Sequence, residues 1–110
     1  MNTINANPGQ TVRLVVQTLD GYTGARIDGY VPVVRNVYFP DLSLASGYPM
    51  PMVKLDTGLY IHGLSLPSGS TSLGTYIANT YFVDNTGRAI WEVFQIQVSR
   101  PFGNSSVMPL

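Results

Sequence analysis

The stretch 74–98 (GTYIANTYFVDNTGRAIWEVFQIQV) decides the fold class of this chain. Two runs rich in β-branched and aromatic residues flank the loop sequence DNTGR at 84–88. This pattern predicts two antiparallel strands joined by a hairpin whose loop carries a glycine. In the second run, alternation puts Phe94, Ile96 and Val98 on one face, which we expect to be buried.

The same alternation, continued backward along the second run, puts Glu92 inside and Trp91 outside. A β-bulge near residues 91–93 would return Trp91 to the core. The sequence therefore leaves two alternatives, a regular strand with Trp91 exposed or a bulged strand with Trp91 buried.

The rest of the chain reads as short β-rich runs separated by Gly, Pro, Asn and Asp. We expect these runs to form strands at 3–5, 11–18, 33–39, 52–55 and 58–66. About seven short strands and no helical pattern predict an all-β fold, a single immunoglobulin-like antiparallel β-sandwich over residues 1–99. A small barrel is the alternative. Residues 100–110 show no strand pattern, and we expect them to form an extended C-terminal arm. The expected core residues are Val12, Leu14, Val16, Ile77, Phe94, Ile96 and Val98.

The charge content of the chain is low and balanced. Charged residues make up 11% of the 110 residues, with six basic and six acidic side chains, whereas an ordinary domain carries roughly 25%. Protein interfaces are depleted of Lys and Glu and enriched in Tyr, Met and Arg, and this chain has seven Tyr and four Met. We interpret its surface as largely covered by other protein; a neutral monomer with a Ser/Thr/Asn surface is the alternative. Without a basic stripe or a long apolar run we expect neither nucleic acid nor a membrane as partner.

The sequence offers few groups for catalysis. It has one histidine, His62 in a predicted strand, one glutamate and no cysteine. The aspartates are dispersed and lie at predicted turns, where they bond their own backbone. We therefore expect no enzyme activity, no catalytic residue, no metal and no cofactor.

Two tyrosine motifs predict how strands are held. Residues 56–60 (DTGLY) have the D-x-G-x-Y form of a tyrosine corner, and residues 74–76 (GTY) repeat its second half. In such a corner the tyrosine hydroxyl bonds a backbone group where a strand begins. The expected corner residues are Asp56, Gly58, Tyr60, Gly74 and Tyr76.

The order of short motifs resembles bacterial and phage immunoglobulin-like modules: PGQTV at 8–12, DTGLY at 56–60, GTY at 74–76 and DNTGR at 84–88. Beyond that, the chain resembles accessory virion proteins of tailed bacteriophages, especially capsid decoration (cement) proteins. The resemblance implies a structural protein of the virion, made in the host cytoplasm. It also implies virion partners such as the major capsid protein, and copies of the chain itself.

Two segments carry apolar residues outside the predicted strand pattern, which is typical of docking sites. One is the Pro-rich loop 40–52, and the other is the arm. The expected partner-binding residues are Leu42, Leu44, Tyr48, Met50 and Met52 in the loop, and Phe102, Val107, Met108 and Leu110 in the arm. For the loop, the alternative is that half of these residues pack onto the core.

A second class of function stays open. The chain is alternatively an immunoglobulin-like recognition module of a tail or fibre that binds a carbohydrate or a receptor. Tyr22 and Tyr30 flank a loop where they would stack on sugars. A contiguous aromatic platform on one face would favour this alternative.

Overall fold

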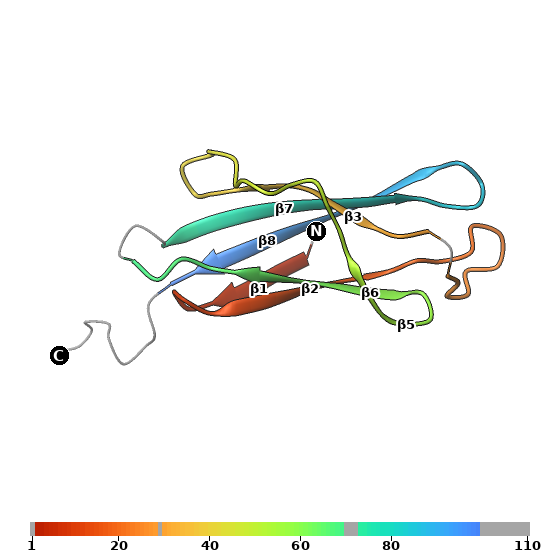
Figure 1. Ribbon diagram of the computed structural model, residues 1–110, viewed down its shortest axis with the longest axis horizontal. Coiled ribbons are helices and arrows are strands. Elements are labelled where there is room, and N and C mark those ends of the chain that lie inside the picture. Colours follow the sequence, from red (N-terminus) through yellow and green to blue (C-terminus); the bar gives the residue numbers. More distant parts are fainter. Residues whose placement is uncertain (1, 29, 70–72, 100–110) are drawn as a thin grey trace.

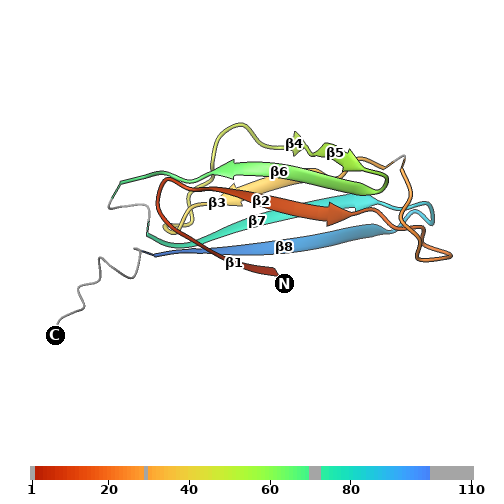
Figure 2. The ribbon, with the colours of Figure 1, turned by 90° about the horizontal axis from the view of Figure 1, so that it is seen from below.

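A computed structural model describes residues 2–28, 30–69 and 73–99. It is an all-β sandwich of two sheets (Figures 1 and 2), which confirms the predicted fold class. The strands are β1 Asn2–Ala6, β2 Thr11–Gln17, β3 Val33–Tyr38, β4 Met50–Pro51, β5 Val53–Asp56, β6 Leu59–Ser65, β7 Gly74–Val83 and β8 Ala89–Val98. One sheet has the order β1-β8-β7-β3-β4 and the other β2-β6-β5, so the alternative of a barrel is wrong. The described residues include no helix long and apolar enough to cross a membrane.

The β7–β8 hairpin is regular over its whole length. Its register runs from Gly74↔Val98 to Val83↔Ala89 without a shift, so the bulge considered near residues 91–93 is absent. Trp91 lies on the outer face, 55% exposed, where its ring stacks on Tyr81 of β7 with 4.7 Å between the ring centroids. This cross-strand contact stabilises Trp91 outside the core.

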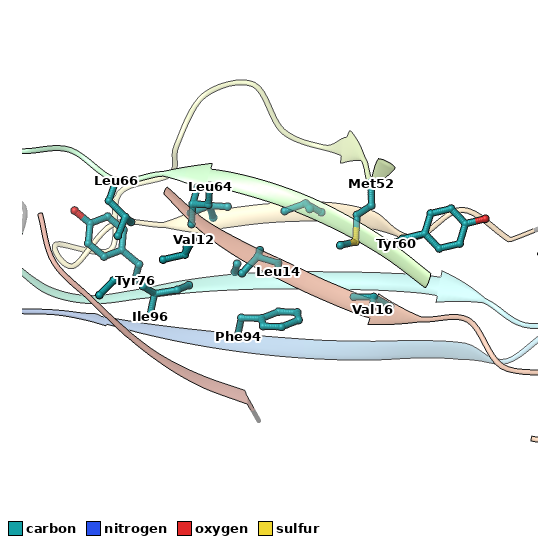
Figure 3. Packing of buried hydrophobic residues seen from close by; sticks show 14 of the residues in the cluster. Val12, Leu14, Val16, Met52, Tyr60, Leu64, Leu66, Tyr76, Phe94 and Ile96 are labelled. Carbon is teal, nitrogen blue, oxygen red and sulfur yellow. The ribbon is translucent and has the colours of Figure 1, made fainter. Parts of the chain in front are cut away.

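The core lies between the two sheets (Figure 3), where Val12, Leu14 and Val16 of β2 face the five-stranded sheet. The predicted core residues of β2 and β8 are all buried, but the prediction for Ile77 is wrong. Tyr76 and Ala78 point inward instead. Because β7 carries apolar residues on both faces, its alternation alone does not decide which face is buried. Pairing with β8, Tyr76↔Ile96 and Ala78↔Phe94, decides it.

The predicted corner at 56–60 is a turn that docks on the preceding loop. Gly58 has φ +64°, donates its N–H to Oδ1 of Asp28 at 2.8 Å and accepts from Thr18 N at 2.9 Å. Asp28 also pairs with Lys54 at 2.7 Å. The aspartate that holds Gly58 is therefore Asp28, whereas Asp56 bonds the next backbone N–H in its own turn.

The two corner tyrosines are both buried, Tyr60 on β6 and Tyr76 on β7. Gly74 lies at positive φ at the start of β7, close to Pro40. A corner bond from either hydroxyl to the backbone stays a prediction.

Candidate docking surfaces

The tip of the β3–β4 loop displays a leucine in a tight turn. Leu42 has φ +70° and is 73% exposed. Phe39 N donates to Ser43 O at 2.8 Å, and Leu42 N donates to Phe39 O at 2.8 Å. Oδ1 of Asp41 accepts from both the N–H and the hydroxyl of Ser43. These bonds fix the turn so that Leu42 points into solvent.

The other predicted loop residues divide between surface and core. Leu44 and Met50 are exposed, and Tyr48 is half-buried against the core. The prediction for Met52 as a docking residue is wrong, since its side chain is 4% exposed and lies in the core (Figure 3). Its N–H donates to Pro32 O at 2.9 Å, which holds the chain against the loop before β3. The sequence did not show this long-range contact.

The outer face of the three-stranded sheet carries an apolar row, a feature that the sequence analysis did not predict. Val15 of β2, Ile61 of β6 and Val53 of β5 lie in one row across the sheet. Val53 is 66% exposed, and Leu55, two residues further along β5, is also exposed. The outer face of an antiparallel sheet is commonly polar. The signal in the sequence was the alternation of Val53 and Leu55 around Lys54.

The single histidine and the single glutamate of the chain lie apart. His62 is buried, and its Nε2 lies 2.9 Å from the Tyr48 hydroxyl; burial lowers the pKa of His62. Glu92 lines a different cavity from His62. Within residues 2–28, 30–69 and 73–99, no group of three His, Cys, Asp or Glu side chains is placed to hold a metal ion.

Asp84 opens the β7–β8 loop and organises it. Its Oδ1 accepts from the N–H and hydroxyl of Thr86 and from Arg88 N. The hydrogen bond from the Thr86 hydroxyl is the largest cause that lowers the pKa of Asp84. All these donors belong to the same loop, so the role of the Asp84 carboxylate is to hold the turn together.

The outer face of the five-stranded sheet carries aromatic and amide side chains. Asn79 lies two residues before Tyr81 on β7, next to the Tyr81–Trp91 stack. Its amide donates to Asn36 Oδ1 of β3 at 2.8 Å. The predicted pair of sugar-stacking tyrosines does not form, because Tyr22 is exposed while Tyr30 packs against the core.

A groove of about 620 Å³ opens along one side of the sandwich, between β2 and β8. Its floor includes Phe82 and Phe94, and its rim includes Arg13, Arg88 and Glu92. Asn2 Nδ2 donates to Glu92 Oε2 at 2.7 Å across one end.

The predicted arm, with Phe102, Val107, Met108 and Leu110, lies outside the described residues. No protein family matches this chain, and no curated protein is similar to it in sequence. The function proposed below therefore rests on the short sequence motifs and on the geometry of the chain itself.

Proposed function

We propose that this chain is a non-enzymatic structural protein of a tailed-phage virion, a capsid decoration protein that binds the capsid lattice. The resemblance in sequence supports the virion, and the exposed apolar surface supports docking to protein. The observation that carries the docking function is Leu42, a bulky apolar residue held at positive φ and 73% exposed at a loop tip. Unfavourable backbone conformations of this kind gather at functional sites.

The strength expected of one contact is modest. Full burial of a large apolar side chain contributes roughly 1.5–3 kcal/mol, so Leu42 and Leu44 together contribute about 3–6 kcal/mol before the entropic cost of association. That is too weak for a stable complex of one copy. The apolar face around Val53 adds area to the contact, and many copies on a repeating lattice tolerate weak individual contacts.

The arm is the second anchor that we propose. Ordering it costs about 1–2 kcal/mol per residue in backbone entropy, which contacts with one small sandwich do not offset over eleven residues. Burial of Phe102, Val107, Met108 and Leu110 between subunits offsets part of this cost. The prolines at 101 and 109 lower it further, since proline is already restricted before binding.

Co-sedimentation with capsid particles of the phage that encodes the chain tests this function. We expect the double variant Leu42→Ser with Leu44→Ser to bind at least tenfold more weakly than the unchanged chain. Tyr22→Ser is the matched control, since Tyr22 is 78% exposed on a different loop, and we expect it to bind normally.

Deletion of residues 101–110 is the second part of this test. We expect the deletion to leave the melting temperature unchanged and to weaken particle binding at least tenfold. Normal decoration by both the leucine variant and the truncated chain would refute the proposed function, and unfolding of the truncated chain would refute the anchor.

A recognition module for carbohydrate is the second candidate, and the Tyr81–Trp91 stack beside Asn79 and Asn36 favours it. Aromatic faces next to amide groups suit the apolar faces and hydroxyls of sugars. Binding to a glycan array that is lost in Trp91→Ala, with particle binding retained, would favour this candidate. A silent array would exclude it for the glycans tested.

A further inference from the structure

Strand β8 has a neighbour on its outer side along only half of its length. β1 runs parallel to it from Asn2↔Phe94 to Ala6↔Val98, and Figures 1 and 2 show β1 beginning near the middle of β8. Among the strands of the described residues, none pairs with 89–93 on that side. Over the described residues, this half of β8 is therefore a free edge.

The backbone groups of the free edge point outward. Ser99 N donates to Ala6 O at 3.1 Å, so the N–H groups of odd-numbered residues in this regular strand point to the β1 side. Even-numbered residues then point their backbone groups toward β7. In agreement with this, Arg88 O accepts a hydrogen bond from Asp84 N on the β7 side. The peptide groups of Ala89 and Trp91 therefore face the open side, where a further strand would bond them.

The groove between β2 and β8 lies beside this edge. Its floor is apolar, with Phe82, Ile90 and Phe94 from the five-stranded sheet, and Leu19 lines it near the end of β2. A groove with an apolar floor and a charged rim, next to unpaired backbone groups, is complementary to an extended peptide. The peptide backbone bonds the edge, and alternate side chains enter the groove.

We propose that the occupant is the C-terminal arm of a second copy of the chain, which adds a strand at residues 89–93. Residues 104–108 (NSSVM) lie between Gly103 and Pro109. The arm therefore offers a run of five residues, the same length as the free edge at residues 89–93. Pro109 has no N–H and ends the pairing. Alternation directs either Val107 or Met108 over the apolar floor.

The arm of the same copy is badly placed for this edge. β8 ends at Val98, beside Ala6, and Val93 lies roughly 17 Å back along the strand at about 3.3 Å per residue. β1 occupies the side of β8 in between, so an arm that folds back must pass around it. A copy placed end to end along the 56 Å axis avoids this detour.

The resulting contact joins different surfaces of the two copies, so it repeats from copy to copy as a row or a ring. This inference rests on the proposed anchoring role of the arm, and it names the partner as a second copy and the site as the free half of β8.

Cysteine pairing tests the contact in the full chain, which has no cysteine of its own. We mix chains that carry Ala89→Cys with tagged chains that carry Asn104→Cys or Met108→Cys, the residues opposite Ala89 in a parallel and in an antiparallel pairing, under oxidising conditions, and expect a disulfide-linked heterodimer from one of the two mixtures. The matched control replaces Ala89→Cys by Asn5→Cys, exposed on β1 beside the covered half of β8. An equal yield of heterodimer with Ala89→Cys and with Asn5→Cys would overturn the proposal.

A synthetic peptide of residues 100–110 provides a second test, with full-length protein as receptor. Trp91 is the only tryptophan of the chain and lies on the free edge, so its fluorescence reports binding of a peptide that has none. We expect saturable binding that a shuffled peptide lacks. Leu19→Glu, at a groove residue that is 38% exposed, is expected to weaken it at least tenfold; Val83→Glu, at a residue 46% exposed outside the groove lining, is not.

Neither test uses capsid particles, so the two proposals fail separately. Peptide binding without decoration of particles refutes the proposed function and leaves this contact standing. Arm-dependent decoration without peptide binding or the heterodimer refutes this contact alone.

Discussion

Replacing Gly58 with alanine tests why the turn at 56–60 needs a glycine. An ideal Cβ on Gly58 lies 2.8 Å from Arg26 Cβ, 2.9 Å from Ile27 N and 3.0 Å from Thr18 O. Two of these three atoms are backbone, so they cannot move aside as a flexible side chain does. The substitution keeps the N–H that bonds Asp28, so it adds only a methyl group and a conformational penalty.

The expected cost has two parts. A non-glycine residue at left-handed φ costs about 1–2 kcal/mol, and forcing an extra methyl group into a packed site costs about 1–3 kcal/mol. Gly58→Ala is therefore expected to lose about 2–5 kcal/mol of unfolding free energy. For a chain of this length, 1 kcal/mol corresponds to about 4 °C in melting temperature, so the expected fall is about 8–20 °C.

Gly24 provides the matched control. Its φ is +77° and no atom lies within 4 Å of its ideal Cβ, so Gly24→Ala incurs only the conformational cost, about 4–8 °C. Thermal unfolding followed by circular dichroism measures both variants. If Gly58→Ala melts within about 2 °C of Gly24→Ala, the close approach of the 18–28 loop to Gly58 does not limit this position, and the reasoning is refuted.

Four further outcomes are expected from thermal unfolding. Tyr48→Phe removes the bond to His62 Nε2 and is expected to cost about 1 kcal/mol; a variant as stable as the unchanged chain would contradict that role. Burial lowers the pKa of His62, so His62 takes up a proton at a higher pH in the unfolded chain than in the folded one. Stability is therefore expected to fall as the pH drops below about 6.5. His62→Gln should remove this pH dependence. The bond from the Thr86 hydroxyl lowers the pKa of Asp84, so its contribution is present above about pH 4 and is lost as the pH falls through the folded pKa; a stability curve of Asp84→Asn that parallels that of the unchanged chain below pH 4 would refute it. Tyr60→Phe or Tyr76→Phe is expected to cost about 1 kcal/mol or more if that tyrosine forms a corner; two neutral variants would exclude it.

The sequence by itself determined seven of the eight strands and much of the core, whereas it placed the short strand β4 in a loop. Alternation in β2 correctly identified Val12, Leu14 and Val16 as buried, and the DNTGR loop located the hairpin. Both signals are local, since a strand alternates every two residues and a turn needs particular backbone angles. They are readable without knowledge of any distant contact.

The tertiary structure decided the features that depend on pairing between distant segments. Alternation groups residues by face but does not choose the buried face when both faces are apolar, so Ile77 and Trp91 were settled by the register with the partner strand. Met52 lies in the core, and its backbone bonds Pro32, twenty residues away. The row Val15–Ile61–Val53 comes from three strands, and the groove is lined by residues of β2, β7 and β8. Such surfaces form only when strands far apart in sequence align.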